Sequence, residues 1–211
     1  MVVLSRWAAN AQAFILLRNA NLLTDAYGVA RIGAELGILA AWAWHGGNGS
    51  DRFKTPAERV EALTLEANAS TRVWFDEMKK LGAALPGYDD STKWGRALKA
   101  AARVNPRSIE QMANCTNATR ELYVFGYRGS SGSVHSAAWV LASHAAGAPP
   151  LPETRMLHDV LMTAMVTFEA AGNMLEDDRL RQMAARLQQV VRERSARALA
   201  AARERETSKD K

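Results

Sequence analysis

Apolar positions recur every three or four residues along almost the whole chain, and no stretch alternates with the period of two that predicts a strand. The pattern predicts an all-α fold, a single helical domain of about six or seven helices with a basic C-terminal helix. The expected helices cover about 4–23, 24–44, 55–85, 92–103, 105–127, 133–146, 153–175 and 178 onward. Only "RNAN" (18–21) separates the first two, so they can form one continuous helix.

The third expected helix has the clearest start. Thr55 and Glu58, three residues apart, form a capping box, and Pro56 occupies the first helical position. Helical spacing gives this segment a face that we expect to point inward, formed by Val60, Leu63, Ala67, Trp74, Met78, Leu81 and Leu85.

The last two expected helices have regular apolar stripes. In 153–175 the stripe consists of Leu157, Val160, Leu161, Ala164, Met165 and Phe168. Asp177 or Asp178 can cap the final helix, whose apolar positions are Leu180, Met183, Leu187 and Val190. After Val191 the apolar spacing lapses, so we expect a frayed end at 203–211.

Length and composition are those of a globular domain. The 211 residues are 48% hydrophobic, and the single cysteine, Cys115, fits a reducing compartment and a place in the core. The most apolar window, 26–44, contains Arg31 and Glu35, whose charges are costly at bilayer depth. We therefore expect a buried helix in a cytoplasmic protein that does not bind membranes.

The net charge of +5 is unevenly distributed. Residues 179–211 carry ten Lys/Arg and four Asp/Glu, whereas the preceding 178 residues carry 17 basic and 18 acidic side chains. The sequence thus divides into a neutral body (1–178) and a basic C-terminal helix (179–211). A basic segment of this kind either attracts RNA or forms a solvated helix face.

The stretch "YRGSSGSVHS" (127–136) carries most of the candidate chemistry. If it is helical, Arg128, Ser131 and His135 lie on one face, with Tyr127 beside Ser131. A guanidinium can hold phosphate oxygens and an imidazole can exchange protons near neutral pH, which suits RNA cleavage without a metal. In the alternative interpretation, Arg128 caps the preceding helix, Gly129 ends it and His135 belongs to the first turn of the next helix.

Two short motifs carry a resemblance to known families. Arg128 and His135 resemble the Arg-x(4–6)-His motif of HEPN domains, and "YRGSSGSVHS" looks like the late signature of the helical family DUF5677. Arg31 and Glu35 are similar to the Arg-x3-Glu helix of that family. The resemblance covers about residues 10–175. It implies an all-α homodimer that cleaves RNA at a site formed across the dimer, with Arg128 and His135 as catalytic residues.

Arg31 and Glu35 stand one helical turn apart. They either neutralise each other as a structural ion pair or line the same pocket as Arg128 and His135. No histidine or carboxylate spacing indicates a metal, and no glycine-rich phosphate loop indicates a nucleotide, so we expect no metal and no cofactor.

The leading functional hypothesis is therefore a HEPN-like ribonuclease that acts as a toxin or in phage defence, with an antitoxin or other protein as partner. The alternative is a non-catalytic helical module that binds a protein or a nucleic acid.

Overall fold

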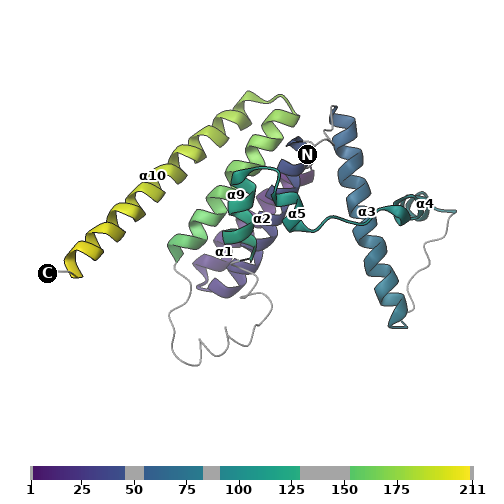
Figure 1. Cartoon of the computed structure of the whole chain (residues 1–211), viewed down its shortest axis with the longest axis horizontal. Coiled ribbons are helices and arrows are strands. Elements are labelled where there is room, and N and C mark those ends of the chain that lie inside the picture. Colours follow the sequence, from purple (N-terminus) through teal and green to yellow (C-terminus); the bar gives the residue numbers. More distant parts are fainter. Residues whose placement is uncertain (1, 46–54, 83–90, 129–152, 210–211) are drawn as a thin grey trace.

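The computed structural model describes residues 2–45, 55–82, 91–128 and 153–209, and every regular element in these ranges is helical (Figure 1). The all-α prediction is confirmed. The elements are α1 (Val2–Asn19), α2 (Leu23–His45), α3 (Pro56–Lys80), α4 (Lys93–Ala100), the short η1 (Ala101–Arg103), α5 (Ile109–Ala113), α6 (Asn117–Glu121), the π-helix η2 (Leu122–Arg128), α9 (Glu153–Met174) and α10 (Asp178–Lys209). The helix expected at 133–146 lies outside the described residues.

The described ranges contain eight α-helices, so the predicted count of six or seven was too low. Residues 105–128 do not form one helix, because Ser108 caps α5 and Thr116 caps α6, each through a capping box. The first two helices are also separate, since Asn21 adopts a left-handed backbone (φ 60°) between them.

Helices α2 and α9 form the centre of the body, with α1 packed on α2 and α10 packed along α9. Gly37 allows the close approach of α2 and α9, because a Cβ at this position would lie 3.3 Å from the side-chain oxygen of Thr167 and 3.5 Å from the carbonyl oxygen of Thr163. The expected buried helix at 26–44 is confirmed, and Ile38 and Trp42 are among its fully buried side chains. Over the part of the chain that the structure describes, no helix is long and apolar enough to cross a membrane.

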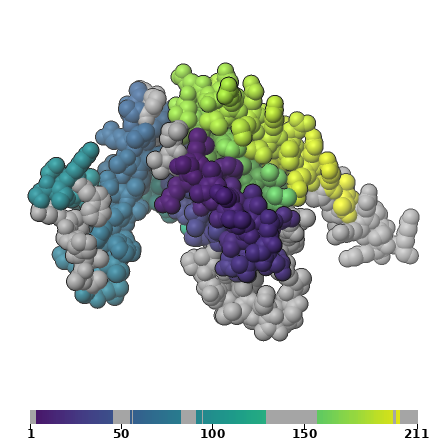
Figure 2. Space-filling model, turned by 180° about the vertical axis from the view of Figure 1, so that it is seen from behind, coloured from purple at the N-terminus to yellow at the C-terminus, as the bar shows by residue number. Residues whose placement is uncertain are grey.

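Helices α3 and α4 form an arm beside this body (Figure 2). The buried carboxylate of Glu66 on α3 accepts hydrogen bonds from the backbone N–H of Arg107 (2.8 Å) and from its guanidinium. The same guanidinium lies 5.5 Å from the ring centre of the buried Trp42. Arg59 of α3 also stacks on Trp44 of α2, at 4.0 Å from the ring centre. Ionic and cation–π contacts thus fasten the arm.

Most of the predicted inward face of α3 is wrong, although Leu63 packs half-buried against the main core as predicted and Met78 is half-buried. Val60, Trp74 and Leu81 are 63%, 53% and 81% exposed, and Ala67 is exposed as well. The helix instead turns Glu66, Ala69 and Phe75 inward. The capping box at Thr55 and Glu58 with Pro56 is as predicted. Leu85 lies outside the described residues.

The turn between α9 and α10 is tight. The N–H of Asp177 bonds to the carbonyl of Gly172 (2.9 Å), Glu176 adopts a left-handed backbone (φ 55°), and the Asp177 carboxylate accepts the N–H of Arg179 (2.8 Å). Asp177 is thus the predicted cap.

The buried face of α10 differs in part from the prediction. It uses Ala184 and Val191, while Met183 and Val190 are exposed. The helix also continues to Lys209, beyond the expected start of fraying, because Ala, Arg and Glu favour helix without tertiary contacts.

Candidate functional site

The stretch that leads into "YRGSSGSVHS" forms the π-helix η2 (Leu122–Arg128). Gly126 faces the body here: a Cβ at this position would lie 2.9 Å from the Leu122 side chain, 3.5 Å from Ala34 and 3.8 Å from the Cβ of the buried Asp159. This close approach seats η2 on α2 and α9. Single π turns within helices are rare and often occur at functional sites.

Arg31 of α2 and Tyr127 of η2, 96 residues apart in sequence, meet in the fold. Nη2 of Arg31 donates a hydrogen bond to the hydroxyl oxygen of Tyr127 at 2.8 Å. The guanidinium also lies over the Tyr127 ring, 4.3 Å from its centre. Both groups are half-buried, which strengthens the hydrogen bond and the cation–π contact relative to open solvent. The structure therefore joins one residue from each of the two candidate motifs.

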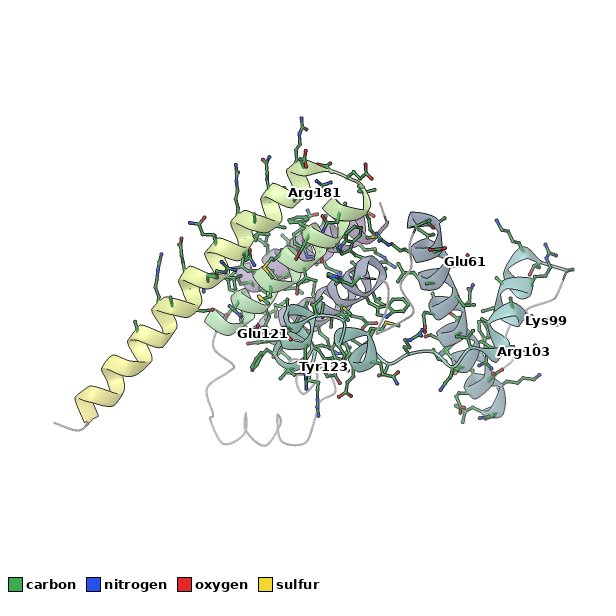
Figure 3. The ribbon with its side chains drawn as sticks, turned by 45° about the horizontal axis from the view of Figure 1, so that its top comes forward. Glu61, Lys99, Arg103, Glu121, Tyr123 and Arg181 are labelled. Atoms are coloured by element: carbon green, nitrogen blue, oxygen red, sulfur yellow. The ribbon has the colours of Figure 1, made fainter. Side chains whose placement is uncertain are left out.

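Tyr123 extends this arrangement to the surface of the body. Its ring stacks on Tyr127 at 5.6 Å with an interplanar angle of 18°, and its hydroxyl donates to the Glu110 carboxylate at 3.2 Å. Partial desolvation raises the pKa of Tyr123, and the Glu110 carboxylate raises it further. The positive charge of Arg128, the residue directly after Tyr127, lowers the pKa of Tyr123. Figure 3 shows Tyr123 on the side of the body away from Arg181 of α10.

Arg128 ends η2 and is exposed. No salt bridge of Arg128 is seen among the residues that the structure describes. Its predicted companions Ser131 and His135 lie outside the described residues. The interpretation of Arg128 as a helix cap fits its place at the end of η2, and both interpretations stay open.

Glu35 is half-buried one turn after Arg31. The recorded hydrogen bond of the Arg31 guanidinium goes to Tyr127, and the Arg31–Glu35 ion pair stays a prediction.

Sequence reasoning missed Tyr123, Glu110 and Asp159. Tyr123 could have been found, because aromatic residues four apart in "YVFGY" share one side of a helix. Asp159 is an acidic residue inside an apolar stripe, and it is buried where α9 meets Gly126 of η2. No sequence pattern indicated a role for Glu110, because its hydrogen bond with Tyr123 depends on how α5 packs against η2.

The described residues include no group of three or more His, Cys, Asp or Glu side chains placed to hold a metal ion. Cys115 packs against the main core and exchanges a hydrogen bond with Thr119 (3.5 Å). Burial raises the pKa of its thiol, which disfavours the nucleophilic thiolate. The cationic and aromatic groups around Tyr127 are therefore better suited to bind an anion or a base than to supply a nucleophile.

No family model, curated protein or solved structure gives a significant match to this chain. The resemblance to HEPN domains and to the DUF5677 family therefore stays a prediction from short motifs.

Proposed function

We propose that this protein binds RNA at the end of η2 and cleaves it without a metal, in the manner of HEPN-like ribonucleases. The observation that carries the proposal is the contact between Arg31 and Tyr127, directly before the exposed Arg128. Guanidinium groups bind phosphate through paired N–H donors, and stacked tyrosines offer a face to a nucleobase. Both requirements of RNA binding meet within one short segment.

In the proposed reaction, His135 removes the proton of a 2′-hydroxyl or supplies one to the leaving oxygen. The 2′-oxygen attacks phosphorus, the bond from phosphorus to the 5′-oxygen breaks, and the leaving oxygen takes a proton. The products are a 2′,3′-cyclic phosphate and a 5′-hydroxyl. Arg128 stabilises the charge that develops on the phosphate, and Arg31 acts as a positioning residue through Tyr127. By resemblance, a second copy of the chain contributes to the site.

The second candidate is a helical module that binds RNA or a protein without cleaving it. It is favoured by the position of the tyrosine pair, which provides a stacking surface on its own. A role as a toxin or in phage defence, with an antitoxin as partner, belongs to the first candidate, because a cell must restrain a free ribonuclease.

The test is cleavage of a labelled RNA by the purified chain. Arg128→Ala and His135→Ala should each lower the cleavage rate by about 10²–10⁴-fold while the helical circular dichroism is unchanged. Arg128→Lys should be nearly as impaired, because a point charge does not reproduce a planar fork. Matched controls are Arg103→Ala, an exposed arginine on the arm, and His144→Ala; both should cleave normally.

The cleaved ends should carry a cyclic phosphate, and a chelator should not slow the reaction. If both alanine variants still cleaved RNA, Arg128 and His135 would not be the catalytic residues. RNA binding that depends on Arg128 and Tyr123, with no cleavage, would establish the binding module instead.

A further inference from the structure

We propose that the RNA site prefers guanine, and that Glu110 is the residue that selects this base. The inference rests on the proposed binding of RNA at η2 and adds to it the identity of one base. Tyr123 offers its ring for stacking, and its hydroxyl donates to the Glu110 carboxylate at 3.2 Å, so the carboxylate lies at the hydroxyl end of the ring. Proteins recognise an unpaired base through an aromatic face together with hydrogen-bonding groups at the edge of the base.

The Tyr123 ring is held in place by its neighbours. Tyr127 stacks on one face of it with ring centres 5.6 Å apart, and Arg31 of α2 holds Tyr127 through a hydrogen bond and a cation–π contact. Tyr123 is half-buried, so part of its ring is open to solvent. Because the ring is already fixed, a base can stack on it with little further loss of side-chain freedom.

The carboxylate beside this ring restricts the ligand. Glu110 is exposed, and its recorded hydrogen bond comes from Tyr123 and goes to Oε2. An ionised carboxylate accepts hydrogen bonds without donating any, and its charge repels phosphate. A base that lies next to Glu110 must therefore present hydrogen-bond donors to it.

The Watson–Crick edges of the four bases differ in the donors that they offer. Guanine has two neighbouring donors, N1–H and the 2-amino group, which match the two oxygens of a carboxylate. Adenine and cytosine each place a ring-nitrogen acceptor beside a single amino group, and uracil places its one N–H between two carbonyl groups. Guanine therefore satisfies both oxygens of Glu110 without bringing an acceptor against the negative charge.

A cation for the phosphate lies on the same helix. Arg128 follows Tyr123 by five residues in η2, and backbone hydrogen bonds of a π-helix join residues five apart, so the two residues lie about one turn from each other. The exposed guanidinium of Arg128 can hold a phosphate of the nucleotide whose base stacks on Tyr123. Its positive charge also offsets the repulsion between Glu110 and that phosphate.

Fluorescence anisotropy with labelled RNAs of nine nucleotides measures the preference. Each RNA is uridine except for its central base, which is guanine, hypoxanthine, adenine or cytosine. Ribose 2′-O-methyl groups block cleavage, so binding is measured by itself. The wild-type chain should bind the guanine RNA roughly 10–100-fold more tightly than the adenine RNA. The hypoxanthine RNA, which lacks the 2-amino group, should fall between them.

Variants separate selection of the base from support of the ring. Glu110→Gln should abolish the preference without weakening binding of the adenine RNA, because an amide does not repel phosphate. If Glu110 only supported Tyr123, binding of all four RNAs would weaken together, and that result would overturn the inference. Tyr123→Ala should weaken binding of every RNA roughly 10–100-fold through the loss of stacking. The matched control is Glu121→Gln, which changes an exposed carboxylate on α6 and should keep the preference (Figure 3).

The failure of this inference differs from the failure of the proposed function. If the wild-type chain bound all four RNAs equally, selection of guanine would be overturned and the proposed RNA binding would stand. If it bound none of them at protein concentrations up to about 100 μM, the proposed function would be overturned, and the inference with it. Unchanged helical circular dichroism in each variant excludes unfolding as the cause of a loss.

Discussion

Two helical glycines should respond in opposite ways to alanine, because their surroundings differ. A Cβ added at Gly172, near the end of α9, would lie 2.9 Å from the backbone N of Arg181 and 3.1 Å from the Cβ of Leu180. A Cβ added at Gly33 of α2 would lie 3.5 Å from a methyl group of Thr163, which is an ordinary contact. Backbone cannot rotate out of the way as a flexible side chain can.

The magnitudes follow from two opposing effects. Alanine gains about 1 kcal/mol over glycine within a helix. Overpacking costs about 1–3 kcal/mol where neighbours cannot move. Gly33→Ala should therefore raise the free energy of unfolding by up to about 1 kcal/mol, whereas Gly172→Ala should lower it by up to about 2 kcal/mol. For a chain of this size, a difference of about 2 kcal/mol separates the melting temperatures by roughly 4–8 °C.

Urea unfolding followed by circular dichroism at 222 nm measures both variants against the wild type. The two midpoints should move to opposite sides of the wild-type midpoint at constant m-value. Truncating the neighbour in Gly172→Ala/Arg181→Ala should not restore stability, because the closest contact is with backbone. If Gly172→Ala stabilised the chain as much as Gly33→Ala, the tight packing of α10 on α9 would be refuted.

Two further predictions concern ionic groups. Glu66→Ala should lower the free energy of unfolding by about 1–3 kcal/mol, because it removes the buried acceptor of the Arg107 backbone N–H and guanidinium. The exposed Glu77→Ala should have a much smaller effect, and equal urea midpoints for the two variants would contradict this. Partial desolvation lowers the pKa of His45, a surface residue at the end of α2, below its usual value of 6.5, while the Glu169 carboxylate acts in the opposite direction. Because the unfolded chain binds a proton at His45 more readily than the folded chain, the contribution of neutral His45 to the free energy of unfolding is fully present above pH 6.5. This contribution is lost as the pH falls from 6.5 toward the lower pKa of the folded state. An NMR titration, with the His45 signal assigned by comparison with His45→Gln, should give a midpoint below 6.5, and Glu169→Gln should lower it further. A midpoint at or above 6.5 would contradict this partial desolvation.

The sequence was most informative where local chemistry decides the structure. The capping box at Thr55 and Glu58, the buried helix at 26–44 and the cap at Asp177 all depend on neighbours within a few residues. The sequence predicted one helix at 105–127, because its apolar residues recur at helical spacing. Capping boxes at Ser108 and Thr116 instead start two separate helices, α5 and α6. Caps of this kind can be recognised in a sequence.

Other features could not be predicted, because they depend on which helices meet. The apolar spacing of α3 is real, but spacing does not say whether a face is covered by the same chain. The contact between Arg31 and Tyr127 similarly depends on how η2 is seated against α2 through Gly126. The spacing that suggested a pair between Arg31 and Glu35 considered one helix alone, whereas the recorded partner comes from another.

The order in which the body is assembled has a consequence for its synthesis. The apolar helix α2 is complete at His45. Helices α1 and α9 pack most extensively on α2, but α9 begins only at Glu153. On the ribosome, the side of α2 that packs against Thr163 and Thr167 of α9 through Gly33 and Gly37 therefore lacks this partner until residues beyond 153 have been made. Transiently exposed apolar surface of this kind is prone to aggregation, so we expect the nascent chain to be most vulnerable before α9 emerges.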